Sequence, residues 1–107
     1  MNNWERMKAG RLYNADSKDL EKYHSFGMET CDKFNRTPLW MKKRKQRLLE
    51  KMIPSAKDGG VAVFAPFYCE YGVNIHFGKG CFVNYKCTFL DCAPITLEDG
   101  VWVGANV

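Results

Sequence analysis

The chain has 107 residues, of which 46% are hydrophobic and 26% charged, with a formal net charge of +4. This length allows one domain, or a small helical piece attached to a repeat, and the hydrophobic content excludes a chain that is disordered throughout. The opening residues lack the apolar segment of a signal peptide, and no apolar run approaches the roughly 20 residues of a membrane span. The five cysteines include no Cys-x-x-Cys pair. We therefore expect reduced thiols, no metal site and a cytoplasmic protein.

Two helices are expected in the first third of the chain. A short helix over 3–9 is predicted to end at Gly10, because glycine is common just after helix C-termini. Apolar residues at spacings of three and four predict a second helix over about 17–34, with Asp16 or Ser17 as its N-cap. His24 lies on the apolar face of this helix, so we expect it to be a packed core residue.

A third helix is predicted to open at Thr37-Pro38 and to stop before Pro54, because proline suits the first helical position and cannot continue a helix. It would carry Leu39 and Trp40 among its apolar residues. Residues 42–47 read KKRKQR, a basic run that can mark nucleic-acid or membrane contact. No aromatic residue interleaves with the run, so we expect a solvated face and neither kind of partner.

The rest of the chain repeats in sixes. The first apolar series consists of Val63, Cys69, Ile75, Cys81 and Cys87 and, after a slip of two residues, Ile95, Val101 and Val107. A second apolar series follows two places later in each six. Such a repeat predicts a parallel β-helix, in which three short sides close a triangular coil and coils stack through parallel ladders. An antiparallel sheet would instead show alternation and hairpin turns. The two extra residues are expected to form a corner bulge within 91–94.

Two local patterns resemble the maltose and galactoside O-acetyltransferase family, which includes the related nodulation acetyltransferase. The first is MKAGRLYNAD at 7–16, which is similar to the start of family members. The second is YGVNIHFG at 71–78, followed by FVNY at 82–85 and LD at 90–91. The patterns occur together and in order, and the resemblance covers nearly the whole chain.

The resemblance implies a helical maltose-acetyltransferase-type domain over 1–56 and a hexapeptide-repeat β-helix over 61–107. Family β-helices coil left-handed, whereas parallel crossovers are normally right-handed, so spacing alone does not predict this handedness. The family transfers an acetyl group from acetyl-CoA to a sugar hydroxyl of the maltose, glucose or galactoside class. The resemblance also implies a homotrimer with active sites between neighbouring subunits.

Matching the family residue by residue implies an acceptor pocket with polar residues and one aromatic wall. Some members carry serine at the position of Glu70 and a second aspartate at that of Cys92. Three of these positions also have a structural explanation. Asp16 can cap a helix, Asn84 can form a corner of the coil, and Asp91 can be part of the corner bulge. The implied acceptor residues are Asp16, Glu70, Phe82, Asn84, Asp91 and Cys92.

A sugar hydroxyl needs a general base to attack a thioester, and histidine suits this task. The family histidine follows the motif that matches 103–107, so it would lie beyond Val107. His76 stands one place after an inward residue and is expected to point out of the coil. We therefore expect a truncated chain that carries the acceptor half of the site, lacks most acetyl-CoA contacts and has no turnover. The alternative is a non-catalytic interaction module that oligomerises.

Overall fold

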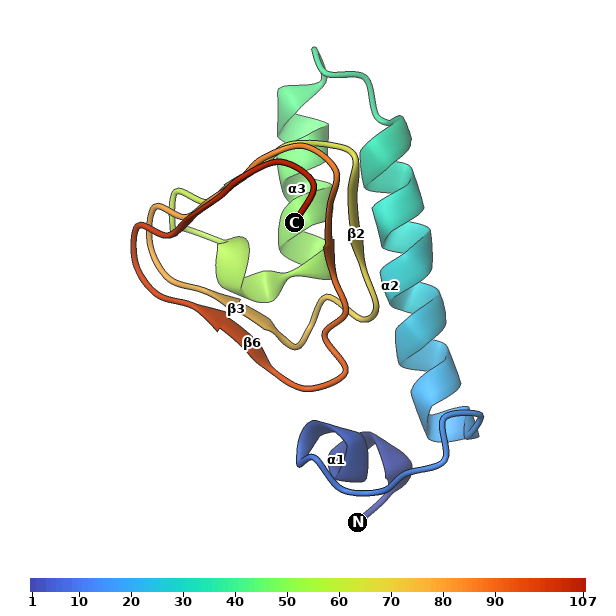
Figure 1. Ribbon diagram of the computed structural model, residues 1–107. Coiled ribbons are helices and arrows are strands. Elements are labelled where there is room, and N and C mark those ends of the chain that lie inside the picture. Colours follow the sequence, from blue (N-terminus) through green and yellow to red (C-terminus); the bar gives the residue numbers. More distant parts are fainter.

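The structure is a computed structural model of residues 1–107, in which helices precede a coil of short strands (Figure 1). The helices are α1 (Asn3–Lys8), α2 (Lys18–Arg36), α3 (Lys42–Met52) and the 3-10 helix η1 (Pro54–Ala56). The strands are β1 (Ala62–Val63), β2 (Phe67–Cys69), β3 (Ile75–Phe77), β4 (Phe82–Val83), β5 (Cys87–Phe89), β6 (Ile95–Leu97) and β7 (Trp102–Val103). No helix is both long enough and apolar enough to cross a membrane.

The first two helices agree with the predictions. The turn after α1 reaches Gly10 with a φ of 73°, a conformation that glycine adopts without steric cost. Ser17 is the N-cap residue of α2 by position, but its side chain makes no cap bond and its hydroxyl donates to the carboxylate of Asp19 instead. The predicted end near residue 34 is two residues short, because α2 continues through Arg36.

The predicted start of the third helix is wrong. Thr37 ends α2, since its backbone N–H and its hydroxyl both donate to the carbonyl of Lys33. The chain then turns through residues 38–41, and α3 begins only at Lys42. Leu39 and Trp40 consequently lie in the turn between the two helices, with 80% and 78% of their surface exposed, instead of on a buried helix face.

The strands form the three sides of a triangular coil (Figure 1). One side is the sheet β1-β4-β7, the second is β2-β5 and the third is β3-β6, and all pairs are parallel. Each strand pairs with the strand 20 residues later, as Ile75 with Ile95. The predicted parallel coil and the two extra residues near 91–94 are therefore confirmed.

The predicted register of the first coil is wrong by two residues. Val63 pairs with Val83, whereas the sixes had aligned it with Cys81. The first coil also contains two extra residues, at the corner over 70–74. The two longer corners stack on each other, and Asn74 Nδ2 donates to the backbone carbonyl of Asp91 across them at 2.9 Å. Tyr71, a member of the second apolar series, packs with the N-terminal helices.

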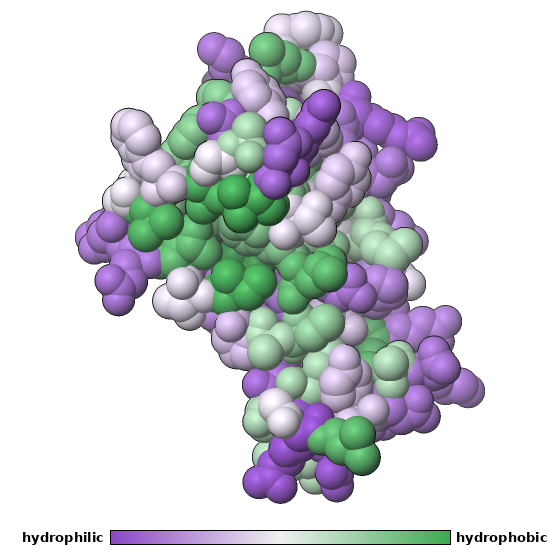
Figure 2. Space-filling view, in the orientation of Figure 1, coloured by the Kyte–Doolittle hydropathy of each residue, from purple (hydrophilic) through white to green (hydrophobic).

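Helices and coil share one hydrophobic core. Side chains from α2, α3 and η1 belong to the same buried cluster as the inward residues of the strands. Three cysteines occupy the inside of the coil as predicted, and all five cysteines are unpaired. Cys31 of α2 reaches this core and places its sulfur 3.3 Å from that of Cys69. In Figure 2, hydrophobic residues gather over the near end of the coil and hydrophilic ones over α2.

Candidate functional site

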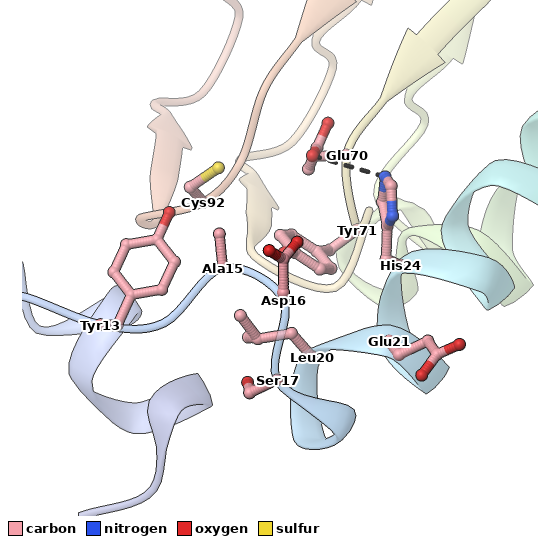
Figure 3. Close-up of a pocket in the computed structure, with 10 residues that line it drawn as sticks. All are labelled: Tyr13, Ala15, Asp16, Ser17, Leu20, Glu21, His24, Glu70, Tyr71 and Cys92. Carbon is pink, nitrogen blue, oxygen red and sulfur yellow. Dashed lines mark ion pairs between the residues drawn. The ribbon is translucent and has the colours of Figure 1, made fainter.

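A pocket of about 430 Å³ lies where the 70–74 and 90–94 corners meet the segment between α1 and α2. Figure 3 shows its side chains, which come from these two corners, from this segment and from the start of α2. The segment between α1 and α2, called the connector below, supplies an aromatic ring and a carboxylate. The first two turns of α2 supply an imidazole and a further carboxylate, and the two corners supply a third carboxylate, a second aromatic ring and a thiol. The lining residues are Tyr13, Ala15, Asp16, Ser17, Leu20, Glu21, His24, Glu70, Tyr71 and Cys92.

Asp91 holds the corner that forms one wall of the pocket. Its carboxylate is fully buried and accepts backbone N–H bonds from Glu70 at 3.2 Å, Tyr71 at 2.8 Å and Asn74 at 3.1 Å. Charged acceptors make hydrogen bonds roughly twice as strong as neutral ones. The structure thus places Asp91 behind the pocket wall, where it fixes the position of Glu70 and Tyr71.

Two glycines allow α2 and α3 to approach this corner closely. A Cβ at Gly27 of α2 would lie 2.7 Å from the carbonyl oxygen of Glu70 and 2.9 Å from Tyr71 Cα. A Cβ at Gly72 would lie 2.5 Å from the carbonyl oxygen of Met52, and its φ of 85° also favours glycine. Since these neighbours are backbone atoms, neither position has room for a side chain.

His24 lies in the pocket and not in the core, so its predicted packing role is wrong. Its Nε2 lies 3.4 Å from the carboxylate of Glu70, and its side chain is 41% exposed. His24 is on the α2 face that carries Leu20 and Gly27, and this face meets the corner of the coil. The periodicity of the helix therefore located the right face, but it did not show that the face ends in a pocket.

The hydroxyl and thiol groups of the pocket are held in their protonated forms. Burial, followed by the charges of Cys92 and Glu70, raises the pKa of Tyr71 to about 12. Burial also raises the pKa of the Cys92 thiol, with the Glu70 charge as second cause, and burial raises the pKa of the Tyr13 hydroxyl. These groups can donate hydrogen bonds at neutral pH, while Glu70 can accept them.

Asp16 belongs to the connector and its side chain points into the pocket (Figure 3). Its backbone N–H donates to the side chain of Asn14 at 3.0 Å, which sets the turn before α2. The structure thus brings Asp16, Glu70 and Cys92, three of the matched positions, together in one pocket. Tyr13, Glu21 and Tyr71 were not singled out for this pocket, and Tyr13 could have been, since it lies in the N-terminal pattern.

Phe82 and Asn84 lie on another side of the same coil. Phe82 is on the outer face of β4, and its ring contacts Phe64 at 4.8 Å and Trp102 at 6.1 Å between centroids. We call these three rings the outer aromatic column. Asn84 follows β4, and its side-chain oxygen accepts from the backbone N–H of Tyr85 at 2.8 Å. Neither residue lines the pocket of its own chain.

Comparison with known proteins identifies the family. Residues 6–57 match the maltose acetyltransferase hexapeptide capping motif. The crystal structure of a maltose O-acetyltransferase from Clostridium difficile 630 matches 95% of this chain and 54% of its own, with a TM-score of 0.89 and 31% identity. The chain belongs to the maltose and galactoside acetyltransferase family.

Two further acetyltransferases match this chain over almost its whole length. A hexapeptide-repeat acetyltransferase from Vibrio cholerae O1 biovar eltor, solved in complex with acetyl coenzyme A, covers 99% of it with a TM-score of 0.80 and 25% identity, over 56% of its own chain. Galactoside O-acetyltransferase from Lactococcus lactis subsp. lactis is 28% identical over 100% of it and 52% of its own length. The chain spans about half the length of the curated relatives it matches.

Proposed function

We propose that this family member takes part in acetyl-CoA-dependent O-acetylation of a sugar hydroxyl and that its pocket binds the acceptor. The observation that carries this proposal is the convergence of Asp16, Glu70 and Cys92, which come from three separate segments of the sequence. A maltose and a galactoside O-acetyltransferase among the relatives support a sugar of the maltose, glucose or galactoside class. The Vibrio cholerae complex supports acetyl-CoA as the donor.

The pocket offers the groups that a sugar needs. The carboxylates of Asp16 and Glu70 accept hydrogen bonds from sugar hydroxyls, and the protonated Tyr13 and Tyr71 hydroxyls donate them. Several such bonds fix which hydroxyl faces the thioester. The general base lies outside these residues in our proposal. His24 is turned to Glu70, and His76 lies exposed on the outer face of β3, away from the pocket.

We further infer that the coil is left-handed and the assembly a homotrimer, as family membership implies. In such an assembly, Phe82 and Asn84 of one subunit complete the pocket of its neighbour. Their position on a different side of the coil from Asp16 supports this arrangement, because one chain alone leaves them apart from the acceptor groups. Residues 1–56 would shape the acceptor pocket, and residues 61–107 would form the stacking coil.

Acceptor binding tests this proposal. Titration calorimetry with maltose and a methyl galactoside is expected to detect binding to the 107-residue chain. Asp16→Asn is expected to weaken it by about tenfold, because a hydrogen bond to a charged acceptor is worth about 1.5 kcal/mol or more. Asp58→Asn is the matched control, since this exposed carboxylate lies outside the pocket. Equal affinity in both variants would remove the acceptor role from the pocket.

A CoA-release assay with acetyl-CoA and maltose tests the placement of the base. We expect no release by the 107-residue chain, and turnover would show that the base lies within it. A chain that forms oligomers but binds neither sugar nor acetyl-CoA would instead fit a non-catalytic interaction module.

A further inference from the structure

The turn between α2 and α3 exposes two large apolar side chains. Leu39 and Trp40 follow each other in this turn, and neither belongs to the hydrophobic core. They reach this position because α2 ends at Thr37 and α3 begins only at Lys42. Because both side chains are exposed, the pair is accessible to a partner.

The first turn of α3 carries side-chain charges that its helix dipole disfavours. It contains Lys42, Lys43 and Arg44, no acidic residue and no side-chain N-cap bond. The N-terminus of a helix carries a partial positive charge, so cations there are unfavourable and anions are favoured. None of these three residues, nor Arg47 one turn later, takes part in an ion pair. The helix start is therefore a strong and uncompensated positive centre.

Lys45 shows what a structural lysine in the same run looks like. Its Nζ donates to the carbonyls of Phe34 at 2.9 Å and Thr37 at 3.3 Å and lies 4.3 Å from the ring centre of Phe34. Burial lowers the pKa of Lys45, as expected of an amine taken partly out of water. The neighbouring cations make no such contacts, so the fold uses one residue of the run and leaves the others to solvent.

Apolar and basic groups share one open hollow. It has a volume of about 540 Å³ and is lined by Trp40, Met41, Lys42, Lys43, Arg44 and Arg47. The turn stands at the top of Figure 1, at the far end of α2 from the acceptor pocket, and Figure 2 shows hydrophobic next to strongly hydrophilic residues there. A partner seated on the turn would therefore leave the pocket open.

The basic run alone predicts a solvated face without a membrane partner, but the exposed Leu39 and Trp40 beside it change this interpretation. We propose that this turn docks on the surface of an anionic lipid bilayer. Trp40 and Leu39 enter the headgroup region, where tryptophan is enriched in proteins, and the cations contact lipid phosphates. Two weak signals, one apolar and one polybasic, together give the binding that either alone does not. Nucleic acid is the less suitable partner, because the leucine offers no stacking face to a base. The contact is peripheral and separate from the proposed acetyl transfer.

Co-sedimentation of the 107-residue chain with vesicles tests the proposal. We expect binding to vesicles of phosphatidylcholine mixed with phosphatidylglycerol, and weaker binding by more than about tenfold to phosphatidylcholine alone. The triple change of Lys42, Lys43 and Arg44 to alanine is expected to cause a loss of similar size. Changing Lys18, Lys22 and Lys57 to alanine removes the same charge from exposed positions elsewhere and should preserve most of the binding.

A second variant tests the apolar half of the contact. Leu39→Ala with Trp40→Ala is expected to weaken binding severalfold while the circular dichroism spectrum stays unchanged, because both side chains are exposed. Three results would overturn the proposal. They are no binding to anionic vesicles, an equal loss of binding in the two triple-alanine variants, or equal binding to both kinds of vesicle. Tighter binding to duplex DNA or RNA that blocks vesicle binding would also overturn it and assign the turn to nucleic acid.

Discussion

At the scale of single residues, the chemistry of the pocket depends on the charge of Glu70. Because burial and, second to it, this charge raise the pKa of the Cys92 thiol, little thiolate is present at neutral pH. Glu70→Gln removes the charge and lowers the pKa, so Cys92 is expected to react severalfold faster with iodoacetamide, with its rate profile displaced to lower pH. Mass spectrometry of the Cys92 peptide measures the rate. Glu21→Gln is the control, since Glu21 lines the pocket but is not a cause of the shift.

Asp91 is a second residue with a measurable role. Asp91→Asn replaces one acceptor oxygen of a buried carboxylate with an NH₂ group that faces backbone donors. We expect the free energy of unfolding to fall by about 2 to 3 kcal/mol, the value of hydrogen bonds to a buried charged group. Urea unfolding followed by circular dichroism measures this change.

Asp99 provides a matched control for that substitution. Its Oδ1 also accepts a backbone N–H, from Lys79 at 2.7 Å, but the bond is exposed to water. Asp99→Asn is therefore expected to cost less than about 1 kcal/mol. Equal losses in the two variants would contradict the role of Asp91 in holding the corner.

At the scale of elements, α2 packs closely against the coil because Gly27 has no side chain. Gly→Ala in a helix interior normally stabilises by about 1 kcal/mol. Here the added Cβ would meet the backbone of the 70–74 corner, so we expect Gly27→Ala to destabilise by about 1 to 3 kcal/mol. Thermal unfolding gives the sign, and Ser25→Ala, at an exposed position of the same helix, should show no such loss. A stabilised Gly27→Ala protein would mean that the helix lies further from the corner.

At this scale, the sequence predicts the repeating parts of the helices and the coil better than it predicts their corners and ends. Periodicity finds the helices and the parallel coil because burial repeats at 3.6 residues in one and at six in the other. It misplaces the first coil, because the corner at 70–74 keeps apolar residues at several positions and hides its two extra residues. It also misplaces the start of α3, where the tertiary role of Thr37 at the end of α2 overrides a common helix-start pattern.

For the candidate site, three of the matched positions, Asp16, Glu70 and Cys92, line one pocket, but residue types alone do not reveal their neighbours there. His24 was read as core because an apolar helix face predicts burial and not what the helix packs against. Asp91 was matched to the acceptor site, while the structure shows both its oxygens bound to backbone groups. Such distinctions depend on contacts between distant segments, which spacing does not encode.

At the scale of the whole molecule, the outer aromatic column is the surface that the proposed trimer would cover. Phe64, Phe82 and Trp102 stack along the side formed by β1, β4 and β7, and Trp102 remains 79% exposed. Buried tryptophans are common centres of binding energy at interfaces, with losses of about 2 kcal/mol or more on truncation. Trp102→Ser is therefore expected to shift the chain from trimer toward monomer, as measured by sedimentation equilibrium, without lowering the unfolding free energy of the monomer.

Tyr68 tests which side of the coil forms the interface between subunits of the proposed trimer. It is also an exposed aromatic residue, but it lies on β2, the strand against which α2 packs. Tyr68→Ser should leave the association constant unchanged, because β2 belongs to a different side of the coil from the outer aromatic column. If Tyr68→Ser dissociates the trimer and Trp102→Ser does not, subunits meet on the β2-β5 side. Phe82 and Asn84 could then not complete a neighbour's acceptor pocket, because the face that carries them would lie away from the interface.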